Sequence, residues 1–277
     1  MRALIVGGCG FVGLNIAEAL LRRGDDAVLF DANPLHPVAE AAFQALPGGF
    51  TVQLGDVRDP ASVAAAFADH EIDAVFYGAA MTSGPERERE APAQVLQVNL
   101  LGLVNVIKAA AAAGGVGRII NIGSGSAYGR HRQEGKGVVL EEVTPSEPES
   151  LYGISKLATE AVSRRLAGLL ELDIRSVRLA AVYGPWEIDS GARDTLSPLM
   201  QAGLSALRGE RVLLPRRDRQ DWVYSRDVAF ALLALMEAPS PPHDLYHHIA
   251  SATPSSVMDW CAALAGQYPD FQFALAS

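Results

Sequence analysis

Cysteine is scarce in this chain: the 277 residues contain only Cys9 and Cys261, which are far apart in the sequence. Two distant thiols exclude a disulfide framework and a cysteine-based zinc site, and they suit a reducing compartment. Long apolar runs are also missing, because glycine, arginine or aspartate interrupts each apolar segment. No signal-peptide pattern precedes the first strand-like run at residues 2–6, so we expect a soluble, cytoplasmic protein.

Positive charge is the second shortage. The chain has 23 lysines and arginines against 32 aspartates and glutamates, which gives a net charge of -9. Such a balance excludes nucleic acid and anionic membranes as expected partners. With 49% hydrophobic residues, the chain can still bury one large core or two small ones.

Short apolar runs alternate with amphipathic stretches over the first two thirds of the chain. The expected strands are 2–6, 26–30, 50–54, 73–77, 117–122 and 174–179. The expected helices are 12–23, 60–69, 93–113 and 151–171. This alternation predicts an α/β fold, a Rossmann-type doubly wound parallel sheet covered by helices on both faces.

The alternation weakens after residue 183. We expect residues 1–183 to form the sheet domain, elements within 223–250 to return to it, and 184–277 to form a small substrate-binding part. Helices are expected near 195–208, 227–238 and 255–267, with a strand at 245–249. Residues 271–277 indicate no element.

A glycine-rich turn follows the first strand. Gly7, Gly10 and Gly13 form G-x-x-G-x-x-G, and Phe11 and Val12 begin the helix after it. The three glycines suit a tight turn, close approach of the backbone to a pyrophosphate and close packing of helix on strand. A turn without a ligand is the alternative, but a strand before and a helix after the motif indicate dinucleotide binding.

Three further segments end neighbouring strands of the expected sheet. Asp31 can bind ribose hydroxyls and repel a 2′-phosphate, which favours NAD over NADP. Asp56 and Val57 could meet the adenine, while Asp59 with the following proline could start a helix, and both can hold at once. Gly78, Ala79 and Ala80 leave room for the cofactor beside the backbone.

Tyr152 and Lys156 lie four residues apart, on one face of an expected helix. A nearby ammonium lowers the pKa of a phenol and makes it a usable base near neutral pH. This spacing also occurs in exposed pairs that have no function. The pair therefore gains meaning only from the dinucleotide motifs around it.

Together these segments resemble the extended short-chain dehydrogenases/reductases, the NAD-dependent epimerase/dehydratase family, over about residues 1–250. The resemblance includes the ordered segments 7–13, Asp31, 55–59, 98–102, 124–129, 152–156, 178–185 and 221–229. It implies a homodimeric enzyme that takes a hydride from a secondary hydroxyl of a sugar or sugar-like substrate, with NAD and no metal.

The resemblance also implies roles for four residues. Tyr152 would exchange the hydroxyl proton, and Lys156 would lower its pKa and hold the nicotinamide ribose. Ser124 would hydrogen-bond the reacting oxygen. Asn99 would contribute to the cofactor side of the site and order the active-site helix.

Three departures from the family pattern bear on the substrate. Gly125-Ser126 stands where dehydratases of the family carry an Asp-Glu pair, so a 4,6-dehydratase is not expected. Ala181 and Gln220 replace an asparagine and an arginine that contact a substrate diphosphate in nucleotide-sugar epimerases. A basic cluster with Arg217 and Arg219 could compensate by binding a phosphate or carboxylate, or could be a solvated loop.

Other substrate contacts are expected from Thr82, Ser83 and Ser126, and a free sugar acid is an alternative substrate. Epimerisation and net oxidation both remain open, as does a non-catalytic NAD sensor. The charged segment 86–90 is expected to be solvated. An apolar stripe on 93–113 could form a dimer interface or pack on the sheet.

Overall fold

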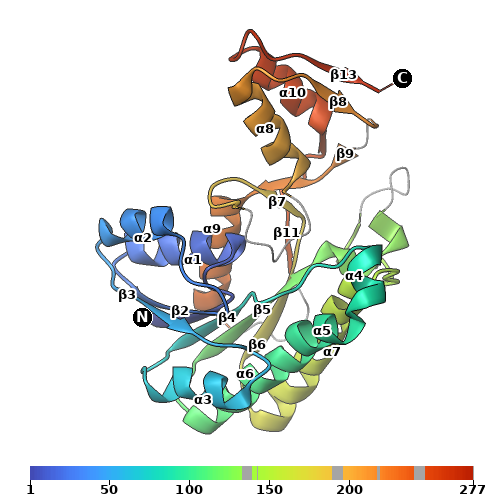
Figure 1. Ribbon diagram of the computed structural model, residues 1–277. Helices are drawn as coiled ribbons and strands as arrows, with labels where there is room; N and C mark the ends of the chain where they lie inside the picture. Colours follow the sequence, from blue (N-terminus) through green and yellow to red (C-terminus); the bar gives the residue numbers. More distant parts are fainter. Residues whose placement is uncertain (133–138, 142, 189–195, 217–218, 240–246, 277) are drawn as a thin grey trace.

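Seven parallel strands form the central sheet of the computed structural model, which describes residues 1–132, 139–141, 143–188, 196–216, 219–239 and 247–276. Their spatial order is β3-β2-β1-β4-β5-β6-β11 (Figure 1). The strands are β1 (Arg2–Val6), β2 (Asp26–Asp31), β3 (Phe50–Leu54), β4 (Ala74–Tyr77), β5 (Arg118–Ser124), β6 (Ile174–Leu179) and β11 (His247–Ile249). This order changes direction between β1 and β4, where a doubly wound sheet opens a crevice for a ligand. The predicted fold class is confirmed.

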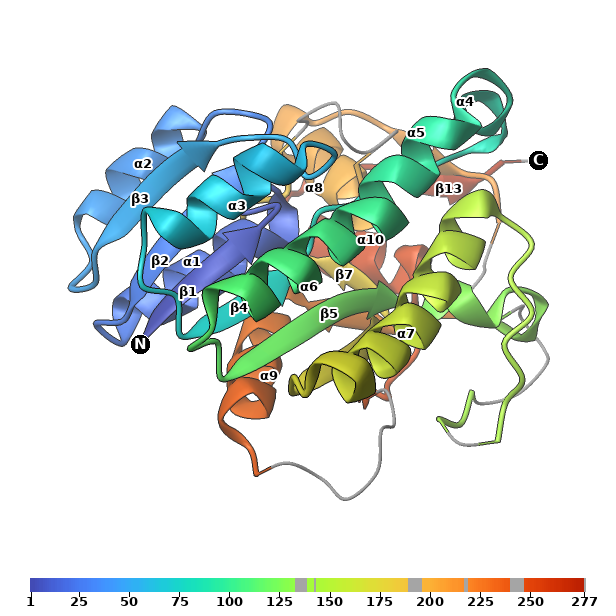
Figure 2. The same ribbon diagram turned by 90° about the horizontal axis from the view of Figure 1, so that it is seen from below.

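Helices cover both faces of the sheet, as Figures 1 and 2 show. One face carries α1 (Phe11–Arg22), α2 (Pro37–Gln44) and α9 (Ser225–Glu237). The other carries α3 (Pro60–Ala68), α6 (Gly102–Ala113) and α7 (Leu151–Leu170). Alternate residues of each strand enter the two cores, so that Ile5 packs with α1 while Leu4 packs toward α3 and α6. Helix α2 was not predicted from the sequence.

The predicted helix 93–113 is interrupted. It consists of α5 (Pro92–Leu96), a π-helical turn at Gln97–Leu101, and α6. Val95, Leu103 and Val106 are buried in the core, so the apolar stripe packs on the sheet. The run Pro92–Ala113, with mean hydropathy 1.6, is long and apolar enough to cross a membrane, which corrects the expectation that no such run exists. The structure buries 39% of its most apolar window, through the stripe that packs on the sheet.

A small C-terminal part lies beyond the carboxyl ends of the strands (Figure 1). It contains α8 (Pro198–Arg208), α10 (Val257–Ala265), β8 (Val212–Leu214) and β13 (Phe273–Leu275). These elements share a separate core that includes Leu214, Cys261 and Phe271. Strand β13 pairs in parallel with β8, so the expectation of no element after residue 271 was wrong.

Short strands lie between the two parts. β7 (Ala181–Tyr183) pairs in parallel with β10 (Trp222–Tyr224), and β9 (Arg219–Gln220) pairs antiparallel with β12 (Ser255–Ser256). The chain then returns to the sheet through α9, which packs beside α1, and β11, which pairs with β6. That the C-terminal part binds substrate stays a prediction.

Candidate active site

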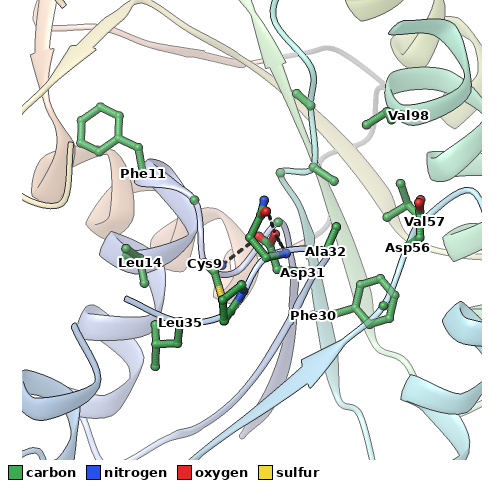
Figure 3. Close-up of a pocket in the computed structure, with 18 of the residues that line it drawn as sticks. Cys9, Phe11, Leu14, Phe30, Asp31, Ala32, Leu35, Asp56, Val57 and Val98 are labelled. Atoms are coloured by element: carbon green, nitrogen blue, oxygen red, sulfur yellow. Dashed lines mark hydrogen bonds between the residues drawn. The ribbon is translucent and has the colours of Figure 1, made fainter. Parts of the chain in front are cut away.

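A cavity of about 600 Å³ opens at the carboxyl ends of β1 to β4 (Figure 3). Nine of the residues expected to bind the cofactor line it: Gly7, Gly10, Phe11, Asp31, Asp56, Val57, Gly78, Ala79 and Ala80. Figure 3 places Phe11 at one end, Val57 with Asp56 at the other, and Asp31 between them. An elongated cavity across the strand ends suits a dinucleotide.

The glycine turn forms the floor of this cavity. Gly7 has a φ of +82°, and a Cβ there would lie 2.7 Å from the amide nitrogen of Ala79. Gly10 is the N-cap of α1 and makes no side-chain cap, which leaves the helix start open to a ligand. The positive end of the helix dipole favours a pyrophosphate at this place.

Val12 and Gly13 lie behind the turn and do not line the cavity. A Cβ on Gly13 would come within 2.3 Å of the carbonyl oxygen of Gly7. Gly13 therefore lets α1 pack tightly against the turn, and a part of Val12 and Gly13 in cofactor binding stays a prediction. Val12 packs against the core.

Asp31 is held at the edge of the cavity by backbone groups. Its carboxylate accepts hydrogen bonds from the amides of Cys9 at 3.0 Å and Asn33 at 2.9 Å. Burial raises the pKa of Asp31, and these hydrogen bonds oppose the rise. A fixed carboxylate at the end of β2 fits the hydroxyls of an adenosine ribose.

Cys9 behaves as a packed residue. Burial, followed by the charge of Asp31, raises the pKa of its thiol to about 12. The thiol therefore stays protonated at neutral pH and is not an activated nucleophile.

Asp56 and Asp59, at the end of β3, have separate roles. The carboxylate of Asp56 accepts from Nε and Nη2 of Arg58, at 2.9 and 2.6 Å, and this hydrogen bonding holds the pKa of Asp56 below its usual range. Asp56 also lines the cavity. Asp59 caps α3 by accepting from the amide of Ala61 at 3.0 Å. One segment thus offers a carboxylate to the cavity and starts the next helix.

Tyr152 and Lys156 lie in the first two turns of α7. The Nζ of Lys156 is 5.8 Å from the centroid of the Tyr152 ring and donates to the carbonyl oxygen of Ile122 at 2.8 Å. The lysine is 2% exposed. Burial lowers its pKa to about 8, and the charge of Glu160 opposes this change. A cation beside the phenol ring is the arrangement that favours a phenolate.

Ser124 and Ser126 face the start of α7 from the end of β5. Ser124 Oγ accepts from the amide of Ser126 and donates to its hydroxyl, both at 3.1 Å. A Cβ on Gly153 would lie 2.6 Å from the carbonyl oxygen of Ser126, so this glycine allows α7 to approach closely. Since Gly153 follows Tyr152 directly, the helix turn that carries Tyr152 packs against the turn that carries Ser126. That Tyr152, Lys156 and Ser124 act together stays a prediction.

Asn99 is fully buried in the π-helical turn. Its Oδ1 accepts from the amide of Met81 at 2.7 Å. Its Nδ2 donates to the carbonyl of Met81 at 3.1 Å and to Ser155 Oγ at 2.9 Å. Asn99 therefore orders α7 against the segment after β4, as expected. Asn99, Tyr152 and Lys156 do not line the cavity, so cofactor contact by these three residues stays a prediction.

A buried ion pair lies one turn beyond Lys156, and sequence analysis missed it. Arg178 donates through Nε and Nη2 to Glu160 at 2.7 and 2.6 Å, and its guanidinium carbon lies 4.2 Å from the centroid of the Tyr128 ring. Both side chains are buried, at 1% and 4% exposure. The four-residue spacing from Lys156 to Glu160 was the signal that could have revealed part of it.

The residues expected to contact the substrate lie on separate segments and do not form one cluster among the described residues. Ala181 lies in β7 opposite Trp222. Arg219 donates to the carbonyl of Pro254, and Arg217 lies outside the described residues. Thr82 and Ser83 follow β4, and helix α4 (Pro85–Glu90) contacts both of them. Arg87 of α4 donates to the carbonyl of Thr82, and Glu88 accepts from Ser83 and from the first amide of α7.

Comparison with known proteins identifies relatives of this arrangement. The model of the NAD dependent epimerase/dehydratase family matches residues 3–246. UDP-glucuronate 4-epimerase 3 of Arabidopsis thaliana is 31% identical over 188 residues. That match covers 66% of this chain and 43% of the plant protein, so the chain spans less than half of that relative's length.

Solved structures share the fold over its whole length. The UDP-glucose 4-epimerase of Thermus thermophilus, in complex with NAD, superposes with a TM-score of 0.79 at 25% identity, covering 99% of this chain and 86% of that one. A dTDP-glucose 4,6-dehydratase of Bacillus anthracis shares the fold with a TM-score of 0.81 at 16% identity, covering 100% and 85%. The expected resemblance is confirmed, and with it NAD as the cofactor of the group. The chain belongs to the NAD dependent epimerase/dehydratase family.

Proposed function

We propose that this chain is an NAD-dependent epimerase that acts on a secondary hydroxyl of a sugar. The observation that carries the proposal is the position of Tyr152, with Lys156 one turn along α7 and Ser124 and Ser126 opposite. The start of α7 packs against the end of β5 and the turn after it, and β5 lies beside β4, whose carboxyl end borders the dinucleotide cavity. Proton transfer and hydride transfer can therefore occur at one carbon.

Each residue has a defined task in this reaction. Tyr152, beside the Lys156 ammonium, accepts the proton of the substrate hydroxyl, and Ser124 holds the oxygen as it becomes a carbonyl. NAD, when bound, supplies the acceptor for the hydride of the same carbon. Tyr152 then returns its proton to the oxygen when the hydride comes back to the opposite face, which gives the epimer without net oxidation.

Nucleotide sugars are the first substrate class that we infer. The relatives at 31% and 25% identity are named as epimerases of UDP-glucuronate and UDP-glucose. A free sugar acid, oxidised with release of NADH, is the second class. It is favoured by Ala181 and Gln220, which offer no charge to a diphosphate, and by Arg219, whose guanidinium donates to Pro254.

A 4,6-dehydratase reaction has less support. Elimination of water needs a second acid near the reacting sugar, and Gly125 and Ser126 supply none at the end of β5. We therefore propose epimerisation or oxidation over dehydration, although a dehydratase shares the fold.

The substitution Tyr152→Phe tests the proposal. It removes only the hydroxyl, so we expect kcat to fall by about two orders of magnitude or more, the range of general acid–base catalysis, while the Kd of NAD changes little. Turnover is measured with UDP-glucose, UDP-glucuronate and free sugar acids, by NADH absorbance and by NMR of the products. Unchanged turnover in the variant would disprove the assignment.

The panel also separates the alternatives. NADH that accumulates only with free acids selects the dehydrogenase, and an epimer without NADH selects the epimerase. A wild-type protein that binds NAD but converts no member of the panel would favour the NAD sensor.

A further inference from the structure

One side chain of the charged segment 86–90 is not a solvated charge. Glu88, in the middle of α4, accepts hydrogen bonds at Oε1 from Ser83 Oγ at 3.0 Å and from the amide of Leu151 at 2.7 Å. Ser83 lies in the segment after β4, and Leu151 is the first residue of α7. A single carboxylate oxygen thus connects the segment after β4 to the helix that carries Tyr152. The expectation of a wholly solvated segment was wrong.

The contact satisfies a group that the helix cannot satisfy itself. The first amides of an α-helix have no partner within the helix. In α7, Ser150 Oγ accepts from the amide of Gly153 at 3.1 Å, and Glu88 accepts from that of Leu151. A carboxylate at this end is also favoured by the helix dipole. Tyr152 lies between the two capped residues, so Glu88 helps to fix the backbone from which the phenol projects.

The segment after β4 is held at its other end as well. Asn99 bonds both backbone polar groups of Met81 and also Ser155 of α7. Arg87 Nη1 donates to the carbonyl of Thr82 at 2.8 Å. The segment therefore connects to α7 at two points, through Asn99 in the buried interior and through Glu88 nearer the surface.

We propose that Glu88 is a positioning residue, which holds the segment Thr82–Gly84 and the start of α7 at a fixed separation and so aligns bound sugar with Tyr152. This inference rests on the proposed function, because the segment matters for catalysis only if sugar lies between it and Tyr152. A shift of about 1 Å in such an alignment can cost roughly a hundredfold in rate. Glu88 does not line the cofactor cavity, and its two hydrogen bonds join the segment after β4 to the start of α7.

The chain offers matched controls on the same short helix. Glu86 and Glu90 are exposed, and they have the same charge as Glu88. Glu88→Ala removes the acceptor, while Glu88→Gln keeps an acceptor oxygen and loses the charge. Ser83→Ala removes one of the two hydrogen bonds and leaves the cap of α7 in place.

We expect Glu88→Ala to lower kcat/KM for the sugar about ten- to a hundredfold, with the Kd of NAD within about twofold of wild type. The kcat/KM of Glu88→Gln should stay within about threefold of wild type. The kcat/KM of Ser83→Ala should lie between those of Glu88→Ala and Glu88→Gln. Glu86→Ala and Glu90→Ala should match wild type. Kinetics of Glu88→Ala equal to those of Glu86→Ala, or an equal loss in the Kd of NAD, would overturn the proposal.

Hydrogen exchange followed by mass spectrometry gives a readout that needs no substrate. Peptides over 81–84 and 150–156 should exchange faster in Glu88→Ala than in Glu86→Ala, while the rest of the sheet is unchanged. If wild type converts no sugar, the proposed function fails, and this exchange pattern alone decides the structural role of Glu88. If the Glu88→Ala peptides exchange at the same rates as those of Glu86→Ala, Glu88 has no such structural role.

Discussion

At the scale of single residues, burial decides what each group in the site can do. Burial disfavours the charged form of each group, so it lowers the pKa of Lys156 to about 8 and raises the pKa of Cys9 to about 12. The lysine remains partly charged and can support a phenolate, whereas the thiol remains neutral and inert. Proximity in sequence to a motif does not distinguish these cases, because Cys9 lies inside the glycine turn itself.

The pKa of Lys156 predicts how activity depends on pH. Above about pH 8 the ammonium loses its proton, and with it the charge that favours the Tyr152 phenolate. We expect kcat/KM to fall on the alkaline side with an apparent pKa near this value. Lys156→Arg keeps its charge throughout, so its alkaline limb should move upward even where the rate is lower. A pH profile of both proteins checks this, and an alkaline limb that does not move would contradict it.

Gly13 predicts a backbone effect on the cofactor site. A Cβ there would lie 2.3 Å from the carbonyl oxygen of Gly7, so Gly13→Ala must displace the turn. We expect about 1–3 kcal/mol lower stability, together with weaker NAD binding. Gly168, in α7, is the control, because a Cβ there meets no atom within 4 Å. Gly168→Ala should leave the Kd of NAD unchanged and should not destabilise. Urea unfolding and calorimetry of NAD binding measure both effects.

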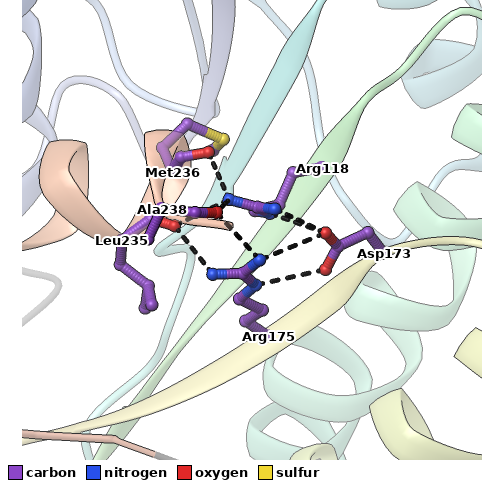
Figure 4. Close-up of polar contacts among 6 residues, drawn as sticks. All are labelled: Arg118, Asp173, Arg175, Leu235, Met236 and Ala238. Atoms are coloured by element: carbon purple, nitrogen blue, oxygen red, sulfur yellow. Dashed lines mark hydrogen bonds and ion pairs between the residues drawn. The ribbon is translucent and has the colours of Figure 1, made fainter. Parts of the chain in front are cut away.

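At the scale of elements, the sheet and its helices are joined by a few polar side chains that are buried or partly buried. Arg118 and Arg175 both turn toward the end of α9 (Figure 4). They donate to the carbonyls of Leu235 and Ala238 at 2.7 to 3.2 Å, and both pair with Asp173. Cations at a helix carboxyl end satisfy its free carbonyls and complement its dipole. They fix the helix by which the chain returns to the sheet.

The Glu160–Arg178 pair joins α7 to β6 in the same way. Glu160→Gln leaves a buried guanidinium without its counter-charge, so we expect a loss of about 3–5 kcal/mol in the free energy of unfolding. The double variant Glu160→Gln with Arg178→Met removes both charges and should lose less than the sum of the two single variants. Urea denaturation of the four proteins measures the coupling. Additive losses would show that the two charges do not depend on each other.

Sequence analysis predicted elements better where their signal is local. The strands of the sheet and the turn after β1 follow from apolar runs and glycine spacing within a few residues. Strand β13 and helix α4 were not predicted, because elements of three and six residues are too short to show a clear periodicity. The π-helical turn was not predicted either, since it depends on how Asn99 packs against Met81 and Ser155.

At the scale of the whole molecule, two large apolar side chains remain exposed on α7 and on the π-helical turn that contacts it. Leu101, just before α6, is 52% exposed, and Ile154, in α7, is 45% exposed. These helices lie side by side on the outer face of the sheet domain (Figure 2). The expected homodimer stays a prediction, and we propose this face for it.

Leu101→Glu tests the predicted dimer. A charge in an apolar interface is costly, so the variant should sediment as a monomer, while wild type sediments as a dimer. The cofactor cavity does not include Leu101, and the Kd of NAD should stay the same. Leu207, which is 66% exposed on α8 in the C-terminal part, is the control, and Leu207→Glu should remain dimeric. A wild-type protein that is monomeric at all concentrations would contradict the prediction.

The sequence by itself determined the parallel sheet, the dinucleotide turn and the pairing of Tyr152 with Lys156, because each depends on neighbours within one strand, turn or helix. Only the tertiary structure decided which charged residues join separate elements near the predicted site. Glu88 meets Leu151 across 63 residues of sequence, and Glu160 meets Arg178 across 18. Such contacts arise when separate elements pack together and bring an acceptor of one element to a donor of another. Spacing along the chain does not encode that geometry.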